Sequence, residues 1–414
     1  MNIEIINTGS ELLLGTTLNT HGAWIGGELL KLGLRVQRQT TVPDGNAITE
    51  AMAEAMERSD AVIVTGGIGP TSDDLTREAA AEVLGVDLIT DEAALRSLEA
   101  FFSSRNRVMA EANKKQALNP VGATILPNPH GTAPGIYAPP RMSGDRLCAL
   151  FLLPGPPGEM KPMFLNEVVP ILRSLADVRD DQQVHTLSFT GVGESDFHAA
   201  LHDAFLAIPN LEIGYCARPS EVDLRLIGPI DSIVRAADLA ISTFSNECFS
   251  HTGESLEEVV VKLLLQRGKK LSLAESCTGG RIASRITDVP GASEVFTHGF
   301  VTYSNLAKQQ LLGVNETTLE THGAVSKEVA VAMAEGALAR SRANIAVSVT
   351  GIAGPGGGSE YKPVGTVWIG LATPTTRMAI RKYHPQGREH FKQATSQNAL
   401  DLIRRALEPA LNIS

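Results

Sequence analysis

Short apolar runs alternate with helical periodicity along the first part of the chain. Residues 3–6 and 61–64 are short, mainly apolar runs of strand type, residues 36–42 continue the pattern, and residues 20–32 repeat their apolar positions at helical spacing. Residues 48–56 continue the alternation. Strands separated by helices are typical of a parallel sheet that is covered on both faces. We therefore expect a three-layer α/β/α domain over residues 1–173.

The pattern changes twice after this domain. Two strand-like and two helix-like stretches, at 184–190, 222–227, 195–206 and 233–244, predict a small α+β module over residues 180–252 that serves as a linker or dimerisation element. A second α/β/α domain is expected over residues 254–414. Its expected strands are 271–273, 296–303, 345–349, 365–372 and 378–383, and its expected helices are 280–286, 326–340 and 389–411.

Composition narrows the class of protein. The chain has 414 residues, a net charge of −10 and only 5% aromatic residues, and it lacks a stripe of Lys and Arg, which disfavours nucleic acid as a partner. The four cysteines are scattered and form no C-x-x-C pair, so neither zinc nor a disulfide framework is indicated. We find no leader-like N-terminus and no apolar run of membrane-spanning length. A cytoplasmic protein without a membrane partner is expected.

A glycine-rich loop follows the apolar run at residues 61–64. Gly66, Gly67 and Gly69 allow close approach of the backbone to an anion, and Thr71 and Ser72 add hydroxyl donors. The acidic pair that ends the loop, Asp73 and Asp74, stands where the next helix is expected to begin. One carboxylate can cap this helix while the other holds a divalent cation, and a further turn places Glu11 at the same sheet edge. The simpler interpretation is that these are only turn and cap residues.

A second loop, Ala-Glu-Ser-Cys-Thr-Gly-Gly, follows the strand expected at 271–273. Ser276 is exposed at the sheet edge in this interpretation, and the N–H groups of the turn from Ser276 to Gly280, with Thr278 and Gly279, can form an oxyanion hole. A nucleophilic serine needs a base. Tyr303 and Lys308, one helical turn apart, can face the same pocket. Ser276 could instead be only a helix N-cap, and Cys277 is a rival nucleophile without a neighbouring histidine.

A third loop is also rich in glycine. Thr350, Gly351 and Ala353 open a glycine-rich stretch after the strand at 345–349, which suits a phosphate or a ribose. Arg388 could pair with a phosphate.

Both halves of the chain resemble the CinA family, competence/damage-inducible protein A. The front resemblance rests on Gly-Gly-Ile-Gly-Pro-Thr-Ser-Asp-Asp at 66–74, Gly-Ser-Glu-Leu at 9–12 and Pro-Gly-Pro-Pro-Gly-Glu at 154–159. It is similar to the MogA-like molybdopterin-binding domain. The C-terminal resemblance rests on the loops at 274–280 and 350–357 and on the motifs at 301–305, 322–326 and 362–367.

This resemblance implies two hydrolytic activities. The C-terminal domain would be a nicotinamide mononucleotide (NMN) amidohydrolase that needs no cofactor, with Ser276 as nucleophile, Tyr303 and Lys308 in proton transfer, and Thr350 and Arg388 on the nucleotide. The front domain would hydrolyse ADP-ribose with a divalent metal ion, where Asp73 and Asp74 match the family's acidic pair and Glu11 is a further ligand. A homodimer is the expected assembly.

Two other functions remain open from the sequence. The chain could be a non-catalytic nucleotide or molybdopterin sensor with a role in competence. It could also be a molybdenum-cofactor biosynthetic enzyme acting through Asp73, although the attached amidase-like domain speaks against this.

Overall fold

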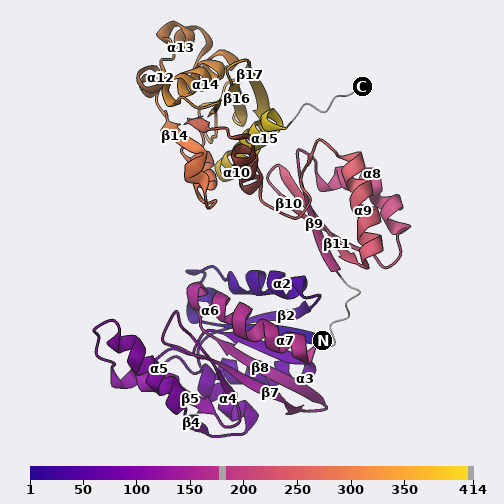
Figure 1. Ribbon diagram of the computed structural model, residues 1–414, viewed down its shortest axis with the longest axis vertical. Coiled ribbons are helices and arrows are strands. Elements are labelled where there is room, and N and C mark those ends of the chain that lie inside the picture. The colour runs from indigo at the N-terminus through magenta and orange to yellow at the C-terminus, as the bar shows by residue number, and fades with distance from the viewer. Residues whose placement is uncertain (177–182, 409–414) are drawn as a thin grey trace. The chain divides into compact units, whose positions relative to one another are not determined.

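A computed structural model describes residues 1–176 and 183–408. The chain divides into two compact units, Met1–Gln182 and Gln183–Ser414, and each is described by itself (Figure 1). Within the described ranges, no helix is both long and apolar enough to cross a membrane. The first residues of the module expected at 180–252 and the last residues of the helix expected at 389–411 lie outside the described residues.

The first unit is built on a six-stranded sheet with the order β2-β1-β3-β8-β7-β6. Four neighbouring strands, β2, β1, β3 and β8, are parallel, whereas β7 pairs antiparallel with both β8 and β6. The expected all-parallel sheet is therefore wrong at one edge, where the hairpin from β7 to β8 reverses the chain. The strands are β1 (Asn2–Thr8), β2 (Arg35–Val42), β3 (Ala61–Thr65), β6 (Thr124–Leu126), β7 (Gly135–Ser143) and β8 (Arg146–Leu153).

Helices cover both faces of this sheet (Figure 1), as expected for three layers. Alternate residues of one strand explain this: Val62 and Val64 of β3 pack towards α3 and α4, and Ile63 packs towards α2, α6 and the segment that follows α6. The helices of the unit are α1 (Ser10–Leu13), α2 (His21–Lys31), α3 (Asn46–Arg58), α4 (Thr76–Leu84), α5 (Glu92–Ser103), η1 (Glu111–Ala117), α6 (Pro157–Met163), η2 (Phe164–Val168) and α7 (Val169–Leu175). A separate two-stranded sheet joins β4 (Leu88–Thr90) to β5 (Leu118–Pro120).

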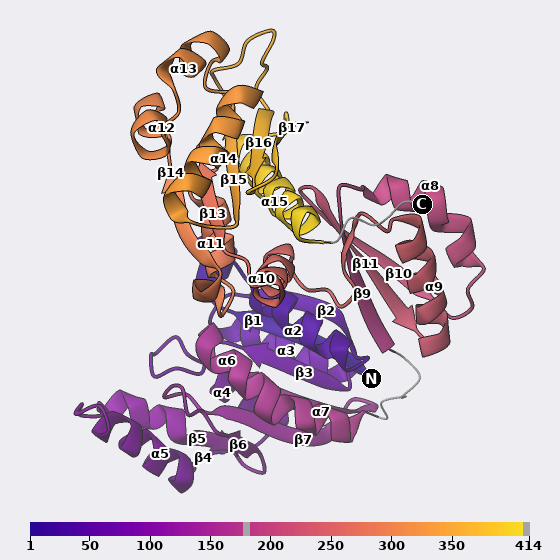
Figure 2. The ribbon, with the colours of Figure 1, turned by 45° about the horizontal axis from the view of Figure 1, so that its top comes forward.

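The second unit begins with the expected α+β module. Its antiparallel sheet has the order β10-β11-β9-β12, and two helices pack on one face (Figure 2). The elements are β9 (Gln183–Thr190), α8 (Glu194–Leu206), β10 (Glu212–Arg218), β11 (Glu221–Gly228), α9 (Ile230–Thr243) and β12 (Cys248–Ser250). Two hydrogen bonds tie the module to the last helix, α15 (Arg388–Leu407): Gln397 donates to Glu221 (2.5 Å) and Arg404 donates to the carbonyl of Asn246 (2.8 Å).

The rest of the second unit is a five-stranded sheet with the order β14-β13-β15-β16-β17. Strands β13, β14 and β15 are parallel, and β16 and β17 complete the sheet in antiparallel pairing. The strands are β13 (Leu271–Glu275), β14 (Phe296–Val301), β15 (Ile345–Gly351), β16 (Thr366–Ala372) and β17 (Arg377–Tyr383). The helices are α10 (Leu256–Arg267), α11 (Arg281–Thr287), η3 (Ala292–Glu294), α12 (Asn305–Leu312), α13 (Glu316–His322) and α14 (Lys327–Ser341).

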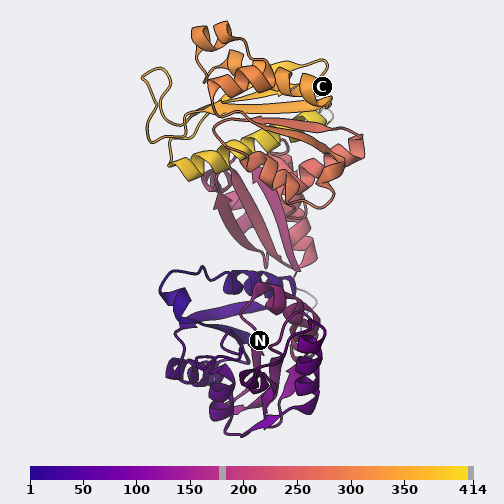
Figure 3. The same ribbon diagram turned by 90° about the vertical axis from the view of Figure 1, so that its left-hand side faces the viewer.

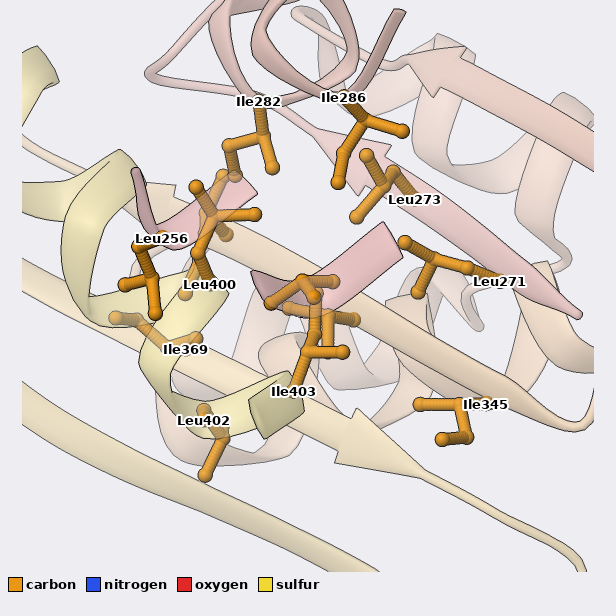
Figure 4. Close-up of a cluster of buried hydrophobic side chains, with 14 of the residues drawn as sticks. Leu256, Leu271, Leu273, Ile282, Ile286, Ile345, Ile369, Leu400, Leu402 and Ile403 are labelled. Atoms are coloured by element: carbon orange, nitrogen blue, oxygen red, sulfur yellow. The ribbon is translucent and has the colours of Figure 1, made fainter. Parts of the chain in front are cut away.

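Strand alternation again divides the core between two faces. Leu271 and Leu273 of β13 point towards α10, α11 and α15, where Leu400 and Ile403 join them (Figure 4). Ala274 lies on the other face, under α14. Figure 3 shows the yellow α15 on one side of this sheet and the orange α14 on the other. The inner strand β13, which lies between β14 and β15, is thus buried on both faces.

Candidate active sites

Ser276 lies directly after the buried strand β13, where the sequence places it. Its backbone N–H donates to the carbonyl of Val349 on the neighbouring β15 (3.0 Å). The expected exposure of this residue is wrong: it is only 8% exposed, because the turn after β13 folds back onto the sheet. Helix α11 begins at Arg281 with Gly280 as its N-cap. Ser276 is therefore no helix cap, and its hydroxyl is available for another role.

Lys308 is the partner of this hydroxyl. Helix α12 places its ammonium nitrogen Nζ 3.1 Å from Ser276 Oγ and 2.9 Å from the carbonyl oxygen of Thr302. The lysine is 1% exposed, and this burial lowers its pKa because the charged form is poorly solvated there, while the neighbouring thiol of Cys277 opposes the shift. A lysine that is buried and bonded in this way can accept a proton from the serine.

The turn is organised by Glu275, to which the sequence analysis gave no role. Its buried carboxylate accepts four hydrogen bonds, from the hydroxyl of Thr278 (2.7 Å) and from the N–H groups of Gly280 (3.0 Å), Ile282 (3.1 Å) and Ala283 (2.8 Å). An acidic residue between a buried strand and a Gly-Gly turn was the signal that could have found it.

These bonds correct the expected oxyanion hole. Three N–H groups of the turn already have acceptors. That of Ser276 donates to the carbonyl of Val349, that of Gly279 to the carbonyl of Ser276, and that of Gly280 to the carboxylate of Glu275. Among the described residues, only the N–H groups of Cys277 and Thr278 within this turn lack an oxygen acceptor. Gly279 and Gly280 have φ values of 62° and 96°, a conformation that favours glycine, and so they shape the turn.

Cys277 is a poor nucleophile in this setting. Burial is the largest of the effects that raise the pKa of its thiol to about 12, and the charge of Glu275 adds to it. The thiolate is the reactive form of cysteine, so the thiol is inert near neutral pH.

Tyr303 and Arg388 form a second cluster near this end of the sheet. Arg388 donates to the hydroxyl of Tyr303 (2.8 Å) and to the carbonyl of Gly354 (2.9 Å) in the third glycine-rich loop. Within the described chain, no hydrogen bond joins Tyr303 to Ser276 or Lys308, and Tyr303 is 61% exposed. The expected proximity to Ser276 is thus found for Lys308, whereas Tyr303 is bonded to Arg388, the residue expected to bind phosphate.

The start of the third loop is engaged in the fold. Thr350 donates its hydroxyl to the carbonyl of Ala324 (2.7 Å), so only its oxygen lone pairs can still serve a ligand. Gly351 lies against Thr366, and Ala353 is buried in the core. These residues anchor the start of the loop, and its exposed part follows at residues 355–361.

The glycine-rich loop of the first unit turns its carbonyl groups inward. Thr76 bonds the carbonyls of Gly66 and Gly67, and the buried guanidinium of Arg77 bonds those of Ile68 and Gly69. Gly66 is required here, because a Cβ atom would lie 2.7 Å from Thr8 Oγ1. Arg77 carries no hydrogen bond to a carboxylate in the described residues, and burial lowers its pKa to about 10. This buried cation behind the loop, Arg77, was not predicted from the sequence.

The acidic residues of the loop do not cap the next helix. Helix α4 begins at Thr76 after Leu75, without a side-chain cap. Asp74 instead accepts the N–H (2.9 Å) and the hydroxyl of Thr71, while Asp73 is exposed, as are Thr71 and Ser72. The expectation of a helix-capping carboxylate is therefore wrong, because the helix starts two residues later than the acidic pair.

No ready-made three-carboxylate metal site exists in the described part of the chain. No group of three or more His, Cys, Asp or Glu side chains lies close enough to hold a metal ion. Glu11 lies on α1, and its carboxylate approaches the backbone of Gly9. A divalent cation could still be held by one or two carboxylates together with substrate phosphates and water, which is how Mg²⁺ is commonly bound.

A histidine that received no role also lies at this sheet edge. His21 Nδ1 is 3.1 Å from the hydroxyl of Thr65, the last residue of β3, and that hydroxyl donates to Asn7 (3.0 Å) on β1. Burial lowers the pKa of His21.

The stretch after β6 and the start of α6 meet away from the glycine-rich loop. Asn128 donates to Glu159 (2.7 Å), which joins the stretch after β6 to the start of α6. A cavity of about 830 Å³ lies between α5 and this stretch, with Phe101, Asn128 and Thr132 among its lining residues. The glycine-rich loop at 66–74 does not line this cavity.

Comparison with known proteins accounts for both units. A family model described as a probable molybdopterin binding domain matches residues 4–174, and one described as the CinA C-terminal domain matches residues 253–407. A CinA-like protein from Akkermansia muciniphila is 48% identical over 402 residues, which cover 97% of this chain and 96% of the relative. A putative competence-damage inducible protein from Caldicellulosiruptor bescii is 45% identical, with 98% and 99% covered.

Solved structures match part of the chain. The crystal structure of the competence/damage inducible protein CihA from Agrobacterium tumefaciens is 45% identical and covers 37% of this chain and 96% of that one, with a TM-score of 0.35. The protein CinA from Thermoplasma acidophilum, described as having unknown function, is 34% identical and covers 42% and 99%, with a TM-score of 0.37. From the full-length relatives and the two domain matches, this chain belongs to the CinA family of competence/damage-inducible proteins.

Proposed function

We propose that the C-terminal part of the chain is an amidohydrolase that converts NMN into nicotinate mononucleotide and ammonia. One observation carries the proposal: the buried Nζ of Lys308 lies 3.1 Å from Ser276 Oγ. A protein that only binds nucleotides needs neither a nucleophile nor a desolvated base. The substrate itself is inferred from the resemblance of the loops to CinA proteins.

The chemistry follows from the contacts of these two side chains. Neutral Lys308 accepts the proton of Ser276 while Oγ bonds to the carboxamide carbon, and the N–H of Cys277, which has no oxygen acceptor among the described residues, would bond the developing oxyanion. Lys308 then gives this proton to the leaving nitrogen, the C–N bond breaks, and ammonia departs. Water attacks the resulting ester while Lys308 takes its proton. Lys308 then returns this proton to Ser276 Oγ as the C–O bond to serine breaks, which releases nicotinate mononucleotide and restores the serine and the neutral lysine.

Arg388 is proposed to hold the phosphate of the nucleotide. Its guanidinium already donates to the carbonyl of Gly354 and to the hydroxyl of Tyr303, and these two bonds fix it at the third loop. Arginine is well suited to phosphate because two N–H groups can bond it at once. Tyr303 then acts as the support of this arginine, while Lys308 remains the base.

We propose hydrolysis of ADP-ribose to AMP and ribose 5-phosphate for the first unit. The support is the glycine-rich loop, whose carbonyls point inward and are bonded by Thr76 and by the buried Arg77. The positive charge of Arg77 behind the loop favours an anion such as a diphosphate. A divalent cation held by Asp73 or Asp74 would neutralise charge on the phosphates.

A product analysis tests both activities at once. The purified protein is incubated with NMN and with ADP-ribose, each with and without a divalent metal, and the products are separated by chromatography. We expect ammonia and nicotinate mononucleotide from NMN without added metal. Tight binding of either nucleotide without any product would favour the alternative of a non-catalytic sensor.

Asp74→Asn is expected to reduce turnover of ADP-ribose and to leave deamidation of NMN intact. The substitution removes a charge that a cation needs, and we expect a loss of roughly tenfold or more because affinity for a hard cation depends on charged oxygen ligands. Steady-state rates measured over a series of metal concentrations check this. Asp145→Asn is a control, since Asp145 is exposed in the turn between β7 and β8, at the edge of the sheet opposite to the loop. Activity that is insensitive to a chelator would rule out the metal.

A further inference from the structure

Glu275 connects the two side chains of the proposed dyad through both its backbone and its carboxylate. Its backbone carbonyl accepts the N–H of Thr302 (2.8 Å), and the carbonyl of Thr302 in turn accepts from Lys308 (2.9 Å). Its carboxylate holds the far end of the turn that carries Ser276. One residue thus lies between the nucleophile and the base in the hydrogen-bond pattern.

The four bonds to the carboxylate are strong enough to define the turn. Hydrogen bonds to an ionised acceptor are shorter and roughly twice as strong as those between neutral groups. Glu275 is 1% exposed, and Thr278 is fully buried, so water does not compete for these donors. Loss of the acceptor would leave three backbone N–H groups and one hydroxyl without a partner in a buried place, which is costly.

The carboxylate leaves the base unpaired. No hydrogen bond or ion pair joins Glu275 to Lys308 in the described chain. The carboxylate bonds residues of the turn and of α11, whereas the amine of Lys308 bonds Ser276 and Thr302. A direct pair would stabilise the charged amine and make it a weaker base. The carboxylate therefore fixes the backbone near the dyad without stabilising the charged form of Lys308.

We propose that Glu275 is a positioning residue of the amidase: it holds Ser276 Oγ opposite Lys308 and fixes the turn that carries the N–H of Cys277. The inference rests on the proposed function, since it assigns a role within the same site. Displacement of a reacting group by about 1 Å can reduce a rate by roughly 100-fold. The effect is expected in the rate of the chemical step and not in nucleotide binding, because Arg388 is held by other residues.

Glu275→Gln tests this with a side chain of the same shape that has an N–H₂ group in place of one acceptor oxygen. The matched control is Glu258→Gln: Glu258 also accepts bonds at the start of a helix, from the N–H (2.7 Å) and hydroxyl (2.8 Å) of Ser255, but bonds none of the site residues. The first measurement is the rate at which a fluorophosphonate labels Ser276, which needs no substrate. The second is kcat and KM for NMN over a range of pH.

We expect labelling and kcat of Glu275→Gln to fall by at least roughly tenfold, with KM within about threefold of wild type. The acidic limb of the pH profile should stay in place, because Lys308 keeps its surroundings, and Glu258→Gln should behave as wild type. Labelling within twofold of wild type would overturn the inference, as would a loss that only follows the fraction of folded protein. If Glu275→Gln does not fold, Glu275→Asp, which retains the charge but is one methylene shorter, must show the same selective loss.

The two measurements separate failure of this inference from failure of the proposed function. If wild type is labelled at Ser276 but does not deamidate NMN, the substrate is wrong and the labelling rates still decide the role of Glu275. If wild type is not labelled, Ser276 is not an activated nucleophile, and the positioning role is overturned with it.

Discussion

Ser276→Ala is expected to abolish release of ammonia from NMN, with a loss of roughly 10⁴-fold or more in kcat. Removal of an essential nucleophile has effects of this size because no other group can form the covalent intermediate. The structure supports the serine as that group, since its hydroxyl is 3.1 Å from the buried amine of Lys308. The fold should survive, because loss of one hydroxyl leaves no sizeable cavity. A coupled assay for ammonia and a thermal melt measure the two quantities.

Cys277→Ala is the matched control on the next residue. Its thiol has a pKa of about 12 and belongs to the hydrophobic core, so we expect most of the activity to remain and a modest loss of stability. The reverse result, an inactive Cys277→Ala and an active Ser276→Ala, would assign the reaction to the thiol. The serine mechanism would then have to be abandoned.

The layers of the fold could be predicted from apolar periodicity. Strands β1 and β3 and helix α2 lie within a residue or two of the positions that the pattern indicates. Helices α12 and α13, between β14 and α14, were not predicted, although the first carries Lys308. Short helices of this kind have too few apolar positions for a periodic signal, and their ends are set by caps such as Ser304 and Asn315.

The proposed dyad was within reach of the sequence, whereas its support was not. Ser276 and Lys308 are 32 positions apart, and only the parallel pairing of β13 with β14 brings their segments together. The hydrogen bonds to Glu275, and the bond from the N–H of Ser276 to the carbonyl of Val349, depend on backbone directions that residue types do not specify. The same holds for Arg77, whose long side chain returns to the loop eight and nine residues before it.

Lys308→Met is expected to reduce deamidation by roughly 10²- to 10⁴-fold, the usual contribution of a general base. Methionine has a similar length and fills the same space, but it cannot accept the proton of Ser276. Stability should change little, because removal of a buried amine is favourable while Ser276 and the carbonyl of Thr302 each lose a partner. Tyr303→Phe is the control for the other proposed base, and it should mainly raise KM through the loss of its bond to Arg388.

The pH dependence identifies the base independently of the size of this loss. Lys308 must be neutral to accept a proton, so kcat should rise with pH and level off above the pKa of Lys308, which burial places below the ordinary value of 10.5. Residual activity of Lys308→Met should lack this limb, and that of Tyr303→Phe should retain it. Since a base of a given pKa leaves its own limb in the profile, a limb that persists in Lys308→Met and disappears in Tyr303→Phe would transfer the proton to the tyrosine. The 3.1 Å contact between Lys308 and Ser276 would then serve only to orient the hydroxyl.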